Sequence, residues 1–96
     1  MNTLQEIQSV LVSHKQRLFR EYPIKSLAIF GSYSRNEQKT DSDLDVLIEF
    51  SGKIGIRFID LAEEIEVITG TKVDLVSKNA IKGKYLDAIS TDLIYV

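Results

Sequence analysis

Two short apolar runs separated by about twelve polar residues constrain the fold more than any other feature. The first run covers residues 26–30 and ends at Gly31, and the second covers residues 44–50. Both have the length and side chains of buried strands. The polar segment, residues 31–42, is short for a crossover between parallel strands, so we expect the two strands to be antiparallel. Gly31 then lies beside the start of the second strand.

A third strand is predicted over residues 73–77. It follows a segment, residues 57–69, in which apolar residues recur at helical spacing. Gly70 is a suitable end for that helix. Because a full helix joins them, the second and third strands suit a parallel pair. The start of the third strand, which carries Asp74, then also lies beside the start of the second.

The flanking segments complete an α/β (α+β) pattern. A helix is predicted over residues 3–20, with Thr3 and Glu6 as a capping box and Pro23 beyond its end. A short helix over residues 82–89 and a strand over residues 93–96 follow the third strand. Residues 34–38 have room for one helical turn. The order of elements predicts a single domain, residues 1–96, with a mixed β-sheet and flanking helices.

Three aspartates occupy chemically informative places in this pattern. Asp43 and Asp45 are two residues apart on a strand, so their carboxylates project from one face. Like charges so close repel each other unless a cation lies between them, and oxygen ligands favour Mg²⁺ or Mn²⁺. Asp74 alternates with apolar neighbours and is expected to face the pair. The alternative, that these are turn and strand residues without a ligand, stays open at this point.

The Gly31-Ser32 turn directly follows the first buried strand. Such a turn can bring backbone N–H groups and a hydroxyl close to a phosphate, although a plain turn glycine is the alternative. The sequence contains no Walker A or Gly-x-Gly-x-x-Gly pattern. An EF-hand reading of residues 41–52 fails, because Val46 and Gly52 stand at its sixth and twelfth positions.

Composition narrows the range of partners. The formal net charge is −2, which argues against a nucleic-acid partner, while a bound metal would still allow a small anionic ligand. There is no cysteine, so disulfides and thiolate metal sites are excluded. No apolar run approaches the roughly 18 residues of a membrane span, and the N-terminus does not read as a signal peptide. We therefore expect no membrane partner and a cytoplasmic location.

Taken together, these motifs resemble the MNT-type minimal nucleotidyltransferases of the DNA polymerase beta superfamily. The shared pattern is Gly31-Ser32, ten residues, Asp43-x-Asp45 and a later carboxylate on a strand, here Asp74. The resemblance covers residues 24–77 closely and implies the polymerase beta-like nucleotidyltransferase fold. It also includes Arg35, Ser42 and Gly70.

The resemblance implies a role for each motif residue. Asp43 and Asp45 would bind Mg²⁺ that bridges the triphosphate of ATP. Asp74 would complete a second metal site and help to activate the attacking hydroxyl. Gly31, through its backbone, and Ser32 would hold the β and γ phosphates. In such a site one ion lowers the pKa of the nucleophile and the other neutralises the leaving pyrophosphate.

Two loop residues need separate comment. Arg35 could bind a phosphate through its planar guanidinium, although an ion pair on the loop surface is an equally good interpretation. Asn36 departs from the family pattern, since many relatives have glycine there. Asparagine tolerates left-handed backbone angles better than most residues, so the departure has little consequence.

The resemblance also implies an activity and a partner. MNT-type proteins act as antitoxins for HEPN-family ribonuclease toxins and transfer AMP to a tyrosine of the toxin. The small size of the chain supports this, because the acceptor must come from another molecule. We expect that acceptor to dock at the sheet edge near Gly31, Asp43 and Asp74. Two alternatives remain: a binding module without catalysis, and nucleotidyl transfer to a small molecule such as an aminoglycoside.

Overall fold

The chain opens with helix α1 (Leu4–Glu21), and the computed structural model describes residues 3–96. The predicted capping box is present: the Thr3 hydroxyl accepts from the Glu6 N–H at 3.1 Å, and the Glu6 carboxylate accepts from the Thr3 N–H at 2.9 Å. Tyr22, extended before Pro23, ends the helix. Residues 1–2 of the predicted domain lie outside the described residues.

A four-stranded mixed sheet forms the centre of the molecule, with the order β3-β2-β1-β4. Strands β1 and β2 are antiparallel and strands β2 and β3 are parallel, as the lengths of their connections predict. Strand β4 pairs with the other edge of β1, antiparallel to it. The strands are β1 (Ile24–Phe30), β2 (Leu44–Phe50), β3 (Val73–Ser77) and β4 (Ile94–Tyr95).

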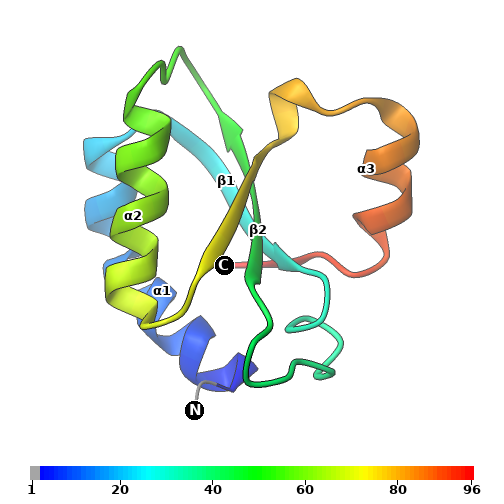
Figure 1. Ribbon diagram of the computed structural model, residues 1–96. Helices are drawn as coiled ribbons and strands as arrows, with labels where there is room; N and C mark the ends of the chain where they lie inside the picture. Colours follow the sequence, from blue (N-terminus) through cyan, green and yellow to red (C-terminus); the bar gives the residue numbers. More distant parts are fainter. Residues whose placement is uncertain (1–2) are drawn as a thin grey trace.

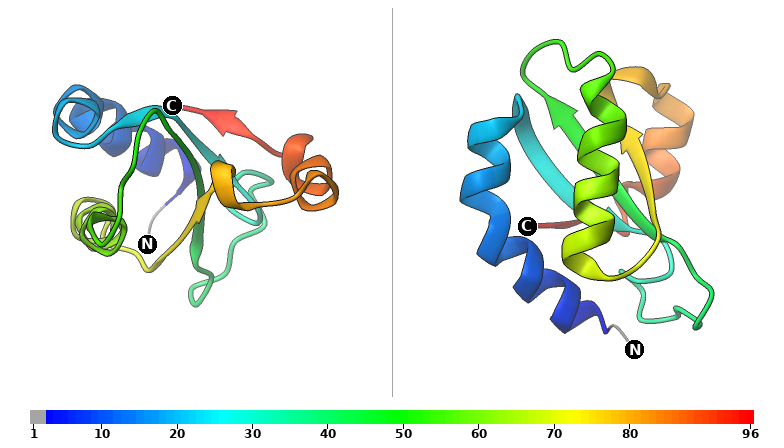
Figure 2. Two further views of the ribbon diagram at one scale, coloured as in Figure 1. Left: turned by 90° about the horizontal axis from the view of Figure 1, so that it is seen from above. Right: turned by 60° about the vertical axis from the view of Figure 1, so that its left-hand side comes forward.

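Helices cover the two faces of the sheet unequally. Helices α1 and α2 (Arg57–Thr69) lie together on one side, and the short helix α3 (Gly83–Ser90) lies on the other (Figures 1 and 2). Gly70, at φ 69°, ends α2 in the left-handed conformation that the sequence predicts for a helix stop. The chain then enters β3, so the end of α2 lies beside the start of that strand.

The alternation of β2 separates the core from the carboxylates. Leu44, Val46 and Ile48 are fully buried under α1 and α2. Asp45 and Leu47 point to the opposite face, where Leu47 is also buried, at 2% exposure. On that face the apolar Leu47 lies between two half-buried acids, Asp45 at the start of β2 and Glu49 near its end.

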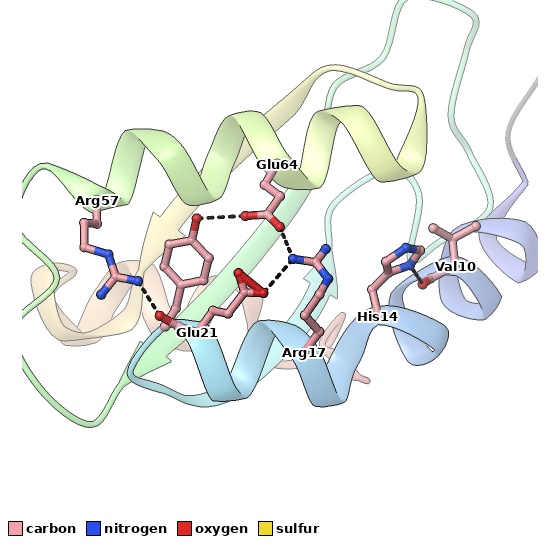
Figure 3. A network of polar contacts seen from close by, with 7 residues as sticks. Val10, His14, Arg17, Glu21, Arg57 and Glu64 are labelled. Atoms are coloured by element: carbon pink, nitrogen blue, oxygen red, sulfur yellow. Dashed lines mark hydrogen bonds and ion pairs between the residues drawn. The ribbon is translucent and has the colours of Figure 1, made fainter.

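A polar network joins α1 to α2 (Figure 3). The Tyr22 hydroxyl donates to Glu64 at 2.8 Å, and Arg17 forms ion pairs with Glu64 and, at 2.9 Å, with Glu21. The guanidinium of Arg57 lies 4.6 Å from the centre of the Tyr22 ring. Each charged group in the network thus has a partner, and together they fix how the two helices pack.

Several predicted boundaries were wrong. Strand β1 begins at Ile24 rather than at residue 26, because the 6% exposed Ile24 pairs with Phe50 across a register shift. Strand β4 is shorter than the predicted 93–96. The predicted turn at 34–38 is not a helix: successive turns span 31–36 and end at Asn36, whose φ of 57° stops a right-handed helix. A 3-10 helix, η1 (Lys78–Ala80), was not predicted.

No helix among residues 3–96 combines the length and the apolar character needed to cross a membrane.

Candidate active site

Asp45 and Asp74 are direct neighbours in the sheet. They are paired positions on the parallel strands β2 and β3, and paired side chains project from the same face. The Leu44 N–H donates to the Lys72 carbonyl at 2.7 Å, which fixes this register one residue before the pair. The two carboxylates therefore stand side by side because of backbone pairing.

Asp43 brings a third negative charge to the same place. It directly precedes β2 and is exposed, whereas Asp45 is half-buried beside Phe30. Burial raises the pKa of Asp45 to about 6, and the charges of Asp74 and Asp43 and a hydrogen bond with Asp74 act in the same direction. The geometry thus brings together the three aspartates that the sequence singled out.

Gly31 is required by the position of Asp45. It follows β1 directly and has φ 74°, a conformation that strains any residue with a side chain. A Cβ atom there would also overlap the Asp45 carboxylate and lie 3.1 Å from its Cγ. The backbone at the end of β1 consequently passes directly against the half-buried carboxylate.

The turn after Gly31 is held by its own backbone. The Gly31 carbonyl accepts from the Ser34 hydroxyl at 2.7 Å and from the Ser34 N–H at 3.1 Å. The Ser32 carbonyl accepts from the Glu37 N–H at 2.8 Å. The half-buried Ser32 hydroxyl makes no hydrogen bond to any residue of 3–96, so it is available to a ligand.

Arg35 is already engaged by two carboxylates. Its Nε donates to Glu37 at 2.9 Å, and its Nη1 donates to Asp92 at 2.6 Å. Asp92 lies in the turn before β4, so this ion pair ties the Gly31 loop to the end of the chain. No sequence signal links residues 57 positions apart, and Asp92 was not predicted. Two of the five N–H donors of its guanidinium are thus already used within the chain.

The donor set fits a hard divalent cation. Among residues 3–96, no three His, Cys, Asp or Glu side chains are already gathered as a metal site. Mg²⁺ does not require such a group, because proteins usually hold it through one or two carboxylates and the phosphates of the substrate. The pair Asp45 and Asp74, with Asp43 beside it, supplies carboxylate oxygens of that kind.

The carboxylates lie at an open sheet edge rather than inside a cavity. One hollow of about 440 Å³ lies along α1, and another of about 470 Å³ lies between the start of α1 and Asn36; none of the three aspartates lines either of them. Both Asp43 and Asp74 are exposed. An acceptor as large as a protein can therefore approach them.

Comparisons with known proteins agree with this arrangement. The family model of the nucleotidyltransferase domain matches residues 11–96. A Methanocaldococcus jannaschii protein, assigned provisionally as a protein adenylyltransferase, is 47% identical over the full length of both chains. The protein adenylyltransferase MntA of Thermococcus cleftensis is 38% identical and matches all of this chain over 98% of its own length.

Solved structures share the fold at lower identity. One described as a minimal nucleotidyltransferase has a TM-score of 0.83, 24% identity and coverage of 97% of this chain and 95% of its own. A chain of a toxin–antitoxin complex with AMP-PNP has a TM-score of 0.72 and 22% identity, covering 86% and 69%. A chain from the complex of the tri-AMPylated Shewanella oneidensis HEPN toxin with its MNT antitoxin has a TM-score of 0.67 and 20% identity, covering 93% and 70%.

The family match, the full-length relatives and the shared fold agree with the motif pattern of the sequence. The chain belongs to the nucleotidyltransferase domain family, and within it to the MNT-type minimal nucleotidyltransferases, which are enzymes.

Proposed function

We propose that this chain transfers AMP from MgATP to a tyrosine hydroxyl of a HEPN-family toxin and thereby acts as its antitoxin in the cytoplasm. The observation that carries the proposal is the pairing of Asp45 with Asp74 directly against the backbone of Gly31. Such an arrangement destabilises the free protein through charge repulsion. It has a clear use only when a cation and a phosphate are bound.

The reaction joins the acceptor oxygen to the α-phosphorus of ATP and breaks the bond to pyrophosphate. Divalent cations at this site would favour ionisation of the acceptor and neutralise the leaving pyrophosphate. Asp43, Asp45 and Asp74 are the residues that would hold them. Asp74, exposed at the edge of the sheet, would also orient the acceptor hydroxyl and receive its proton.

The Gly31 turn is suited to the phosphates. Gly31 has no side chain to block their approach, and the Ser32 hydroxyl is available as a donor. Arg35 would add a guanidinium if ATP displaced it from Asp92. Phe30, buried at 4% exposure next to Asp45, would limit the access of water on the inner side.

The comparisons support a protein acceptor. Relatives that match this chain along its whole length are named protein adenylyltransferases. One structural neighbour comes from a complex in which the HEPN toxin carries AMP groups. The alignment with those relatives covers all of this chain and all or nearly all of each relative.

Intact mass spectrometry tests the proposal. The chain is combined with MgATP and a HEPN-family protein with which it forms a complex, and the partner should gain one or a few AMP groups. Asp45→Asn should abolish the gain, whereas Asp60→Asn, the same change at an exposed site on α2, should not affect it. A partner that is inhibited without gaining mass would instead indicate a binding module, and modification of neither protein would contradict the proposal.

A further inference from the structure

Strand β3 is an edge strand and carries the outermost aspartate of the site. The sheet order leaves one side of β3 without a neighbouring strand, and neither Figure 1 nor Figure 2 shows another segment beyond it. An edge of this kind presents backbone N–H and C=O groups that can pair with another chain. It therefore offers a docking surface that touches the catalytic residues.

The known hydrogen bonds show which backbone groups of β3 point outward. The Leu44 N–H donates to the Lys72 carbonyl, so in the parallel ladder the backbone groups of Asp74 and Val76 face β2. The alternate residues must face away. The Val73 N–H does so, because it donates to the Glu66 carboxylate at 2.9 Å rather than to β2.

Leu75 and Ser77 follow in the same outward set. Within residues 3–96, the Leu75 N–H and C=O and the Ser77 N–H have no hydrogen-bond partner, whereas the Ser77 C=O belongs to the first turn of η1. Both residues are only half-buried, so these groups are accessible. The Leu75 N–H and C=O and the Ser77 N–H are thus available on either side of Val76.

We propose that this free edge binds an extended segment of the protein substrate as an added strand, and that the segment carries acidic residues. An added strand would place one of its side chains next to Asp74 on the carboxylate face, which is where an acceptor hydroxyl must lie. This inference rests on the proposed function and adds to it the way in which the acceptor is presented.

The charges at the two ends of β3 favour such an acidic segment over a second copy of this chain. Lys72 is exposed and has no ion-pair partner among residues 3–96, and Lys78 reaches only Glu49, at 3.6 Å. Symmetric pairing of two copies about Leu75 would place each Lys72 opposite the Lys78 of the other copy. Like charges in that position are destabilising, whereas acidic residues would be attracted.

A proline at position 77 removes one outward N–H without removing a hydrogen bond between β3 and β2. Ser77 has φ −85°, close to the angle that proline adopts, and Val76 before it is extended. With the HEPN-family partner, Ser77→Pro should lower the rate of AMP transfer about five- to tenfold relative to Ser77→Ala, which keeps the N–H. The affinity of both variants for MgATP should equal that of the wild type.

A charge change provides an independent test. Lys72→Glu should slow AMP transfer to the same partner, whereas Lys84→Glu, an equal change at an exposed position on α3, should have a smaller effect. Hydrogen exchange of the wild type tests the edge without any variant, so its result does not depend on whether the proline variant folds. The Leu75 and Ser77 amides should become protected when the partner binds.

The outcomes separate this inference from the proposed function. Equal transfer by Ser77→Pro and Ser77→Ala, or unchanged exchange at Leu75 and Ser77 in a complex that is modified, would overturn the edge proposal and leave the proposed function intact. A dimer of the chain that forms through these amides would also overturn it. No transfer by the wild type would overturn both.

Discussion

Two partly buried acids in this molecule have opposite surroundings. Glu64 on α2 receives hydrogen bonds from Arg17 and from the Tyr22 hydroxyl, and the Arg17 bond in particular holds the pKa of Glu64 below its ordinary value. Asp45 lies beside Asp74 and Asp43, and burial with these like charges raises its pKa to about 6. The same functional group is thus stabilised between the helices and destabilised at the sheet edge.

The difference distinguishes a carboxylate that stabilises the fold from a carboxylate cluster that needs a bound cation. The Glu64 network needs nothing further, because each charge is paired within the chain (Figure 3). The Asp45 cluster lacks positive charge, and Arg35, the nearby cation, is bound to Glu37 and Asp92. A cluster of this kind is maintained against its own repulsion when a cationic ligand completes it.

The largest expected effect is on catalysis. Asp45→Ala should lower AMP transfer at least about 100-fold, because the central carboxylate of the cluster is lost. Its free energy of unfolding in EDTA should be unchanged or higher, since a like charge is removed. Transfer assays and urea unfolding in parallel check both statements. An active variant, or one that is clearly destabilised without metal, would remove the contrast with Glu64.

Gly31→Ala should produce the largest loss of stability. The substitution combines a strained φ of 74° with an overlap on the Asp45 carboxylate, and we expect a cost of about 2–4 kcal/mol. Gly83→Ala is the matched control, because no atom lies within 4 Å of its Cβ position and it starts helix α3. Urea unfolding compares them, and equal stability of the two variants would contradict this view of the turn.

Glu64→Gln should destabilise the helix pair by about 1–2 kcal/mol, because Arg17 loses one of its two charged partners and Tyr22 loses a strong acceptor. AMP transfer should stay at the wild-type level. Glu63→Gln changes the adjacent, exposed residue of α2 and should have almost no effect on unfolding. A loss of activity without a loss of stability would place Glu64 in the functional site instead.

The smallest expected effect is on how the free energy of unfolding depends on pH in the absence of metal. Folding raises the pKa of Asp45 from 3.8 to about 6, so between these values the folded state holds a proton that the unfolded state has released. The contribution of Asp45 to stability therefore falls as pH rises from about 4 to 6. In EDTA, the advantage of Asp45→Asn over the wild type should grow across that window.

The contribution of Glu64 to stability should depend on pH in the opposite direction. Its lowered pKa stabilises the protein above about 4.5, and this contribution is lost as pH falls. The disadvantage of Glu64→Gln should therefore shrink in acid. Urea unfolding at several pH values measures both differences, and parallel curves for the two variants would contradict the assignment of opposite surroundings.

The sequence predicts the sheet and the meeting of the aspartates because both follow from local pattern and connection length. The boundaries of β2, α2 and β3 were correct, since each lies between clear turn signals such as Gly70. The short polar link and the helical link gave the strand directions. Pairing of Asp45 with Asp74 then follows from backbone geometry.

Contacts between distant segments could not be predicted in this way. The ion pair of Arg35 with Asp92 and the bonds of Glu64 with Arg17 and Tyr22 depend on how elements pack, and neither leaves a periodic signal in the sequence. Strand β4 was overestimated because an apolar end of the chain predicts a strand without setting how far its pairing extends.

Calorimetric titration with MgATP tests the central claim most directly, namely that the repelling carboxylates at the sheet edge are a site for a cation and a triphosphate. The wild type should bind with measurable heat, and the double variant Asp43→Ala and Asp45→Ala should lose that binding. Glu64→Gln should bind as the wild type does, because its carboxylate serves the helix pair. No binding by the wild type, or undiminished binding by the double variant, would contradict the account.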